Sequence, residues 1–185
     1  MALANRGTKL DTAANIAVLL LAGIVGIQLT IRQINGRRVT GIDSQSDFKP
    51  GDRIADNTSL ALAAAPYTLL LFNRSGCKFC TDSLPFYQKL AVVARQSGVR
   101  LVSITSEDLD SNRAYLNANQ VPVERVIAAQ ESHLRARGTP TLLLVARTGA
   151  VIDSWSGKLA SQAELRVLDS LQKAVTSTKT VQPSF

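Results

Sequence analysis

The chain has only two cysteines, and they lie three positions apart directly after an apolar segment. Cys77 and Cys80 follow the run from Tyr67 to Phe72, which has the length and composition of a buried strand, and helical periodicity follows them. Backbone N–H groups and the helix dipole stabilise a thiolate at a helix N-terminus. Lys78 adds a cation between the sulfurs. The spacing predicts a redox-active dithiol in which Cys77 is the nucleophile, Cys80 the resolving thiol and Lys78 a residue that tunes the pKa.

Two other roles for the cysteine pair have to be weighed. A structural disulfide here would close a very short loop, whereas cross-links that close long loops stabilise a protein more. A tetrahedral zinc site needs four ligands, and the chain has no second cysteine pair. Its single histidine, His133, lies far away in a polar stretch. We therefore expect no metal site, and a solvated side chain for His133.

An uncharged apolar segment near the N-terminus predicts a membrane anchor. No side chain in residues 12–31 is charged, and about 20 such residues span a bilayer as a helix. Arg6 and Lys9 would also suit a cleaved signal peptide, but no small-x-small cleavage site follows. A buried core helix fits poorly, because the segment is apolar nearly all round. We expect a short flank over 1–11, a single-pass transmembrane signal anchor over 12–31 and a juxtamembrane linker over 32–47.

The charges beside the predicted span do not agree with the topology we expect. Arg6 and Lys9 precede the span, whereas Arg32, Arg37 and Arg38 follow it. The positive-inside rule thus slightly favours a cytoplasmic C-terminal domain. We nevertheless expect that domain to lie outside the cytoplasm, in the periplasm or an equivalent space, because anchors of this kind commonly deliver redox domains to oxidising compartments.

The net charge of +7 raises the question of nucleic-acid binding. The basic residues are scattered and not interleaved with aromatic residues, so we expect no nucleic-acid partner. With 185 residues, of which 45% are hydrophobic, the chain is long enough for one globular domain beside the anchor.

From residue 66 onward the sequence alternates between strand and helix patterns, after a strong turn signal at residues 49–52. This alternation predicts a mostly parallel sheet. The last two strands are joined by a short turn and predict an antiparallel hairpin, so that the central sheet is mixed and flanked by helices. The expected strands are 68–72, 99–105, 125–128, 141–146 and 151–155; the expected helices are 77–96, 111–119 and one beginning at 161.

The last helix begins with a capping box formed by Ser161 and Glu164. Its apolar residues predict a packing face, which we expect to consist of Leu165, Leu168, Leu171 and Val175. We expect the domain to cover residues 48–175 and a polar tail to cover 176–185.

The order of these elements resembles the thioredoxin superfamily over about residues 48–175. Pro85 lies where members of that superfamily carry the proline that kinks the active-site helix. Pro140, preceded by Thr139 and heading a strand, resembles the family's cis-proline, whose loop faces the dithiol. A CxxC motif alone is a weak signal, but with both prolines in register it becomes strong.

The anchor, the segment 48–52 and the extra segment 121–126 are similar to the redoxin and TlpA/ResA-like branch. The resemblance implies a membrane-tethered thiol-disulfide oxidoreductase that exchanges two electrons with protein disulfides or dithiols. It implies a thiol electron donor, and no cofactor other than the redox-active Cys77–Cys80 disulfide. Pro140 would shape the docking groove and Thr139 would offer backbone groups to the substrate.

The sequence departs from the family pattern at two positions. Gly76 replaces the tryptophan that usually precedes the first cysteine, so that Phe79 would have to supply the aromatic surface beside the substrate. Leu71 stands where cytoplasmic thioredoxins keep a buried aspartate that assists proton transfer. These departures leave the dithiol chemistry in place but make the partner and the redox potential unpredictable.

Two rival functions follow from the same residues. A peroxiredoxin-like peroxidase would need a proline and a threonine where this chain has Leu70 and Arg74. A non-catalytic assembly factor, which holds a client during maturation of a cytochrome or dehydrogenase, would use the cysteines only for capture. Replacing Cys80 distinguishes a reductase, which stalls as a mixed disulfide, from a pure docking protein.

Overall fold

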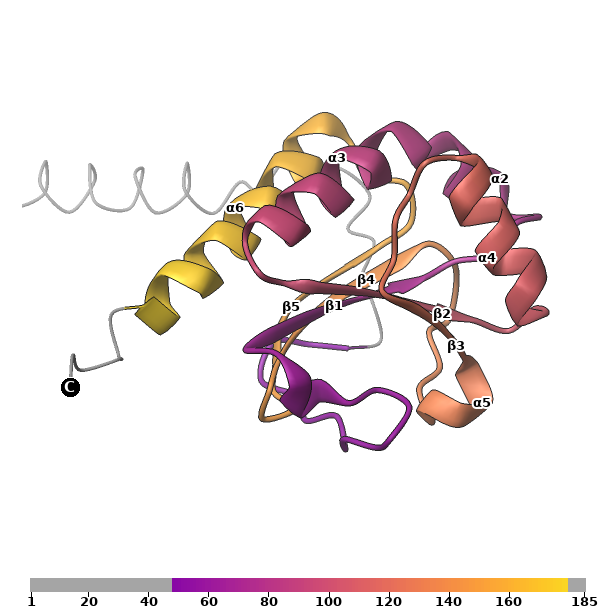
Figure 1. Ribbon diagram of the computed structural model, residues 1–185. Helices are drawn as coiled ribbons and strands as arrows, with labels where there is room; N and C mark the ends of the chain where they lie inside the picture. The colour runs from indigo at the N-terminus through magenta and orange to yellow at the C-terminus, as the bar shows by residue number, and fades with distance from the viewer. Residues whose placement is uncertain (1–47, 180–185) are drawn as a thin grey trace, which may run out of the picture. The chain divides into compact units, whose positions relative to one another are not determined.

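A five-stranded sheet forms the centre of the computed structural model, which describes residues 48–179 (Figure 1). The strand order is β3-β2-β1-β4-β5. Strands β1, β2 and β3 are parallel, whereas β4 runs antiparallel to both β1 and β5. The prediction of a mixed sheet that ends in an antiparallel hairpin is therefore confirmed. The strand bounds are β1 Tyr67–Phe72, β2 Arg100–Thr105, β3 Arg125–Ala128, β4 Thr141–Ala146 and β5 Val151–Ser156.

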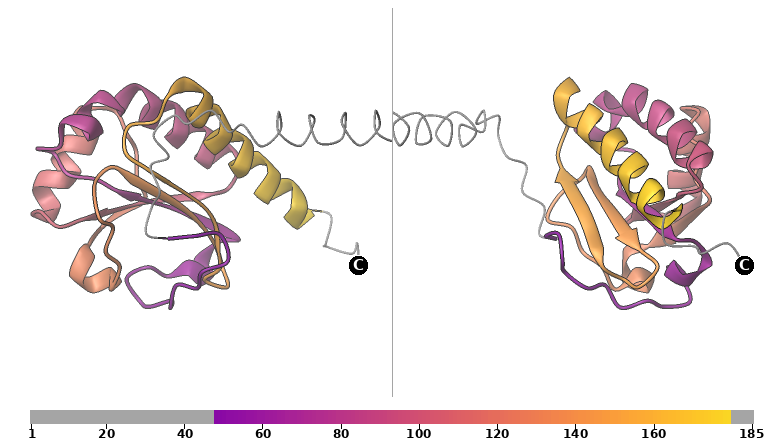
Figure 2. Two further views of the ribbon diagram at one scale, coloured as in Figure 1. Left: turned by 180° about the vertical axis from the view of Figure 1, so that it is seen from behind. Right: turned by 90° about the vertical axis from the view of Figure 1, so that its left-hand side faces the viewer.

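Helices cover the sheet unequally on its two faces. Helices α3 and α6 lie side by side over one face, which α4 also covers, while α5 and the chain before β1 lie on the other (Figures 1 and 2). We call residues 48–61 the leading segment. The helix bounds are η1 Leu62–Ala64, α2 Lys78–Asp82, α3 Leu84–Gln96, α4 Leu109–Ala118, α5 Ala129–Ser132 and α6 Ser161–Lys179.

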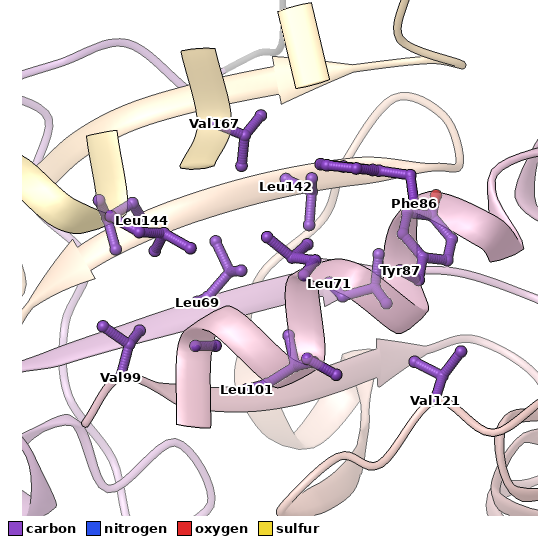
Figure 3. Packing of buried hydrophobic residues seen from close by; sticks show 14 of the residues in the cluster. Leu69, Leu71, Phe86, Tyr87, Val99, Leu101, Val121, Leu142, Leu144 and Val167 are labelled. Carbon is purple, nitrogen blue, oxygen red and sulfur yellow. The ribbon is translucent and has the colours of Figure 1, made fainter. Parts of the chain in front are cut away.

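Alternate side chains of strand β1 point to opposite faces of the sheet and so contribute to both hydrophobic cores. Leu69 and Leu71 belong to the core under α3 and α6, shown in Figure 3, whereas Leu70 and Phe72 belong to the core under the leading segment. All four side chains are buried, and burial of a leucine side chain stabilises a fold by roughly 1.5–3 kcal/mol. Strand β1 is central because both of its faces are apolar.

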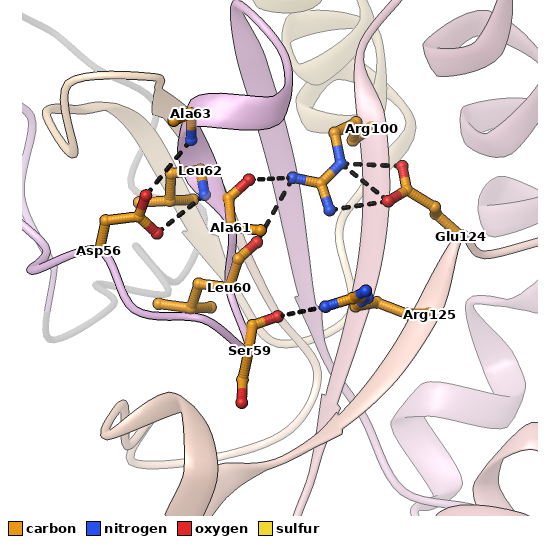
Figure 4. A network of polar contacts seen from close by, with 9 residues as sticks. All are labelled: Asp56, Ser59, Leu60, Ala61, Leu62, Ala63, Arg100, Glu124 and Arg125. Atoms are coloured by element: carbon orange, nitrogen blue, oxygen red, sulfur yellow. Dashed lines mark hydrogen bonds and ion pairs between the residues drawn. The ribbon is translucent and has the colours of Figure 1, made fainter.

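A network of polar contacts fastens the leading segment to the sheet (Figure 4). The guanidinium group of Arg100 lies 2.7 Å from the carboxylate of Glu124 and donates hydrogen bonds to the carbonyls of Leu60 and Ala61. Asp56 accepts a hydrogen bond of 2.8 Å from the backbone N–H of Leu62. These contacts fix the leading segment across the amino ends of β2 and β3.

The helix predicted over 77–96 is interrupted. It divides at Ser83 into α2 and α3, because Pro85 lies in the first turn of α3 and has no N–H to continue the ladder. Ser83 instead closes α2, since its N–H donates to the carbonyl of Cys80 at 3.1 Å. The predicted kink is thus a break between two helices.

The packing face predicted for the last helix is partly wrong. Leu165 is 65% exposed, while Val167, Leu171 and Ala174 form the buried stripe of α6. The helical repeat places these three residues against the sheet, and Leu168 packs beside them. Helix α6 also continues to Lys179, into the segment that we expected to be a polar tail.

The predicted membrane anchor over 12–31, its flank over 1–11 and the linker over 32–47 lie outside the described residues. Within residues 48–179, none of the helices is both long and apolar enough to cross a bilayer.

Candidate functional site

The two cysteines lie where β1 passes into α2. Cys77 is the N-cap of α2, and its Sγ accepts a hydrogen bond of 3.2 Å from the backbone N–H of Cys80. Both residues are free thiols. Cys77 is 9% exposed, whereas Cys80 is completely buried. The structure therefore gives the two sulfurs unequal access to a partner, with Cys77 on the outside.

The thiols also differ in acidity. Burial alone would raise the pKa of Cys77, but hydrogen bonds to its thiolate from the side chains of Cys80 and Thr139 and from the backbone at Cys80 and Phe79 bring it below the ordinary value. Burial, together with the hydrogen bond to Cys77, raises the pKa of Cys80 to about 12. Cys77 is therefore the more acidic thiol of the pair, and Cys80 keeps its proton at neutral pH.

The loop before β4 faces the outer sulfur. Cys77 Sγ donates a hydrogen bond of 3.3 Å to the carbonyl of Thr139, which is 62 positions away in sequence. The Thr139–Pro140 peptide bond is cis, as the resemblance predicts. Thr141 Oγ1 donates to the carbonyl of Gly138 at 2.9 Å and holds the loop closed. The structure thus brings Cys77, Thr139 and Pro140 together.

The other three predicted site residues lie on the surface around α2. Phe79 is 55% exposed, an unusual position for a phenylalanine ring. Gly76 is exposed, and a Cβ built there would meet no atom within 4 Å. The ammonium group of Lys78 pairs with Asp82 at 3.1 Å. The hydrogen bonds at Cys77 lower the pKa of this thiol, and the tuning role of Lys78 stays a prediction.

A buried polar cluster that the sequence analysis did not identify supports the loop before Cys77. Asn73 Nδ2 donates to Ser103 Oγ at 3.0 Å, Ser103 Oγ donates to Asn112 Oδ1 at 2.9 Å, and Asn112 Nδ2 donates to Asn73 Oδ1 at 2.6 Å. All three side chains are fully buried. The signal that could have revealed the cluster is Asn73, a polar residue directly after an apolar strand.

Glu107 connects this cluster to the loop itself. Its carboxylate accepts hydrogen bonds of 2.8 Å from the N–H of Ser75, from the hydroxyl of Ser75 and from Asn112 Nδ2. Although partial burial works in the opposite direction, these bonds lower the pKa of Glu107, which stays charged at neutral pH. The loop that presents Cys77 is therefore held at both Asn73 and Ser75.

Cys80 is fully buried, and among the described residues none of the groups that act most on its pKa is a carboxylate. Leu71, at the position where an aspartate would assist proton transfer, is fully buried in the core. Burial raises the pKa of the nearby Tyr87 hydroxyl far above the neutral range, so this group stays protonated. The described residues contain no group of three or more His, Cys, Asp or Glu side chains that could hold a metal, and His133 is exposed.

Comparison with known proteins establishes the fold. No protein-family model matches the chain, and no curated protein matches it. Solved structures do match. A proposed protein disulfide isomerase from Bacteroides thetaiotaomicron has a TM-score of 0.60 at 14% identity, covering 73% of this chain and 95% of its own. A proposed thiol:disulfide interchange protein DsbE from Chlorobium tepidum has a TM-score of 0.54 at 19% identity, covering 70% and 99%.

A third similar structure is the peroxidoxin BcpB from Mycobacterium tuberculosis, with a TM-score of 0.51 at 15% identity, covering 74% of this chain and 99% of its own. Because all three identities are below 20%, these similarities concern the fold alone. The described residues have a thioredoxin-like α/β fold.

Proposed function

We propose that this chain is a thiol-disulfide oxidoreductase that exchanges two electrons with protein disulfides or dithiols through Cys77 and Cys80. The observation that carries the proposal is the asymmetry of the pair. Cys77 is the more exposed sulfur and has a lowered pKa, whereas Cys80 is buried with a pKa of about 12. A purely structural bridge has no need of such a difference, but a nucleophile and a resolving thiol do.

The reaction balances without a further cofactor. The Cys77 thiolate attacks one sulfur of the client disulfide, and the second client sulfur leaves as a thiolate that takes up a proton. Cys80 then loses its proton and attacks Cys77 Sγ, which releases the first client sulfur as a thiol. The client gains two electrons and two protons, while the Cys77–Cys80 disulfide forms. A thiol donor reverses these steps to regenerate the enzyme.

The local geometry supports both steps. The N–H of Cys80 donates to Cys77 Sγ, so the nucleophile is stabilised by a group that moves with the resolving residue. The position of Cys77 as the N-cap of α2 places its charge at the positive end of the helix. Removal of the buried proton of Cys80 is the difficult part of the cycle, because Leu71 offers no acceptor.

In this proposal the client binds over the loop before β4. Thr139 and Pro140 offer backbone groups to an extended client segment, and the exposed ring of Phe79 gives it an apolar contact on the α2 side. Gly76 leaves room for the client backbone, since a Cβ there would have no neighbour.

We further propose that residues 12–31 tether the domain to a membrane and that the domain faces the extracytoplasmic side. The uncharged segment supports the tether. Because the flanking charges favour the opposite orientation, the topology needs its own test. Reporter fusions at the C-terminus, active only in the periplasm or only in the cytoplasm, would assign the side.

The test of the redox function is an equilibrium titration of the full-length protein against dithiothreitol, with Cys77→Ser and Cys80→Ser as variants. We expect a reversible two-electron couple that both variants abolish. A disulfide that resists reduction until the protein unfolds would contradict the proposal and indicate a structural bridge.

The same variants separate the rival functions. With a disulfide client, Cys80→Ser should accumulate a mixed disulfide on Cys77, whereas a pure docking protein would release its client. Peroxidase activity should be absent, because Leu70 lies in the core and Arg74 is exposed where a peroxidase frame needs Pro and Thr.

A further inference from the structure

A pocket of about 330 Å³ lies beside the dithiol site, at the carboxyl ends of β1 and β2. The pocket and the dithiol site share Thr139, whose carbonyl contacts Cys77 Sγ. Its apolar lining includes Phe72, Ile104 and Leu134, and its polar lining includes Arg135. A peptide that reaches Cys77 across Thr139 would therefore pass this pocket close to its own cysteine.

The lining of the pocket includes one positively charged side chain, that of Arg135. Arg135 is exposed and has neither a hydrogen-bond nor an ion-pair partner among residues 48–179. Glu107, the carboxylate closest in sequence to the β2 end of the pocket, already accepts hydrogen bonds from Ser75 and Asn112 and also faces the charge of Arg74. The guanidinium of Arg135 is left available for an anion that enters the pocket.

We propose that this pocket selects client segments that carry a carboxylate side chain within two residues of the reacting cysteine, and that Arg135 is the residue that recognises it. The inference rests on the proposed function and names the class of its substrate. It makes Arg135 a specificity residue, with no part in the electron transfer itself.

The chemistry of arginine supports a carboxylate as the recognised group. Its planar guanidinium donates two parallel hydrogen bonds to a carboxylate, a geometry that an amide cannot match. The apolar wall formed by Phe72, Ile104 and Leu134 removes water from one side of the pocket, and charge pairs gain strength as water is excluded. Because Arg135 is exposed, we expect a preference of about 5-fold.

The test uses the full-length protein and two peptides that differ only in Glu or Gln beside the cysteine. The cysteine is held as a 2-thiopyridyl disulfide, which is neutral and releases a chromophore when Cys77 attacks. We expect kcat/KM to favour the Glu peptide about 5-fold, through KM, and the preference to shrink at high salt. Arg135→Gln should abolish it, Arg135→Glu should reverse it and Arg135→Lys should restore part of it.

Two controls separate this inference from other causes. Reduction of bis(2-hydroxyethyl) disulfide, which has no flanking residues, should stay within about twofold in every Arg135 variant, and Arg113→Gln on α4 should leave the Glu preference unchanged. An equal rate with both peptides, or a preference that survives Arg135→Gln, would overturn the inference.

If the wild-type protein fails to reduce bis(2-hydroxyethyl) disulfide, it is the proposed function that fails. The pocket can then still be tested with fluorescent Glu and Gln peptides whose cysteine is replaced by serine. Tighter binding of the Glu peptide, lost in Arg135→Gln, would support the pocket's selectivity, and equal binding would refute it.

Discussion

The side-chain amide of Asn112 donates a hydrogen bond of 2.6 Å to the side-chain oxygen of Asn73. This contact joins helix α4 to the loop that presents the dithiol, across 39 positions of sequence. Ser103 completes the cluster from β2, and all three side chains are fully buried. The position of Cys77 therefore depends on Asn112, a residue of α4 that acts through Asn73.

We predict that Asn112→Ala destabilises the protein by about 2–4 kcal/mol, because Asn73 and Ser103 would each lose a buried partner. Urea unfolding of the reduced protein measures the change. Asn117→Ala, at an exposed position of the same helix, is the matched control and should cost less than about 0.5 kcal/mol. Equal losses in both variants would show that the cluster contributes no stability of its own.

Alkylation should distinguish the two thiols. Because the pKa of Cys77 lies below 9.0 and that of Cys80 is raised to about 12, iodoacetamide at neutral pH should modify Cys77 alone in the folded, reduced protein. Mass spectrometry of the digested protein identifies the labelled residue. The rate for Cys77 should rise with pH and level off at a lower pH than the rate for an ordinary cysteine, and labelling of Cys80 first would contradict the proposed roles.

The raised pKa of Cys80 also predicts how stability depends on pH. Above pH 9 the unfolded thiol loses its proton while the folded one keeps it, so the contribution of this group is complete below pH 9 and is lost as pH rises toward 12. Reduced wild-type protein should therefore lose up to about 1.4 kcal/mol per pH unit more than Cys80→Ala over this range. If the free energy of unfolding of the two proteins changed in parallel with pH, the predicted contribution of Cys80 would be contradicted.

Gly149 is predicted to be irreplaceable in the turn between β4 and β5. Its φ is +81°, and a Cβ there would lie 2.1 Å from the carbonyl oxygen of Ile54. The left-handed conformation alone costs a non-glycine residue about 1–2 kcal/mol, so Gly149→Ala should cost more than about 2 kcal/mol in thermal or urea unfolding. Gly76→Ala, which meets no atom within 4 Å, should be close to neutral.

Arg100 should matter far more than an arginine in a surface pair. Its side chain is 9% exposed, and its loss would leave the carbonyls of Leu60 and Ala61 without their donor. We predict that Arg100→Met costs about 1–3 kcal/mol in urea unfolding. Arg113→Met, which breaks an exposed pair with Asp110, should cost less than about 1 kcal/mol. If both variants lost the same free energy of unfolding, the burial of Arg100 would add nothing to its contribution to stability.

The sequence predicts the sheet well because its strands are short apolar runs bounded by turn residues. The range 125–128 and the hairpin of β4 and β5 agree with the structure to within one residue. The alternation of strands and helices predicts a mixed sheet flanked by helices, which is confirmed, whereas the strand order around β1 is known from the structure.

Sequence patterns fail where a contact depends on residues far apart in the chain. The prediction that Leu165 lies on the buried face of α6 is wrong because Leu165 fits a helical stripe as well as Val167 does, and only the position of the sheet selects between them. The cluster of Asn73, Ser103 and Asn112 joins three elements, so no local pattern predicts it. The pocket at Arg135 likewise exists only once β1, β2 and α5 are assembled.

The leading segment has a further consequence for how this domain meets other chains. The N–H of Gly51 donates a hydrogen bond to the carbonyl of Val151, and the N–H of Val151 donates one to the carbonyl of Asp52, at 2.8 Å each. Arg53 forms an isolated antiparallel β-bridge with Ala150. The leading segment thereby covers the start of the outer edge of β5, while the opposite edge strand, β3, has only four residues. Long open edges are where foreign strands add and aggregation begins. If the protein handles other chains with unpaired thiols, as we propose, it thus offers those chains little strand edge on which to add.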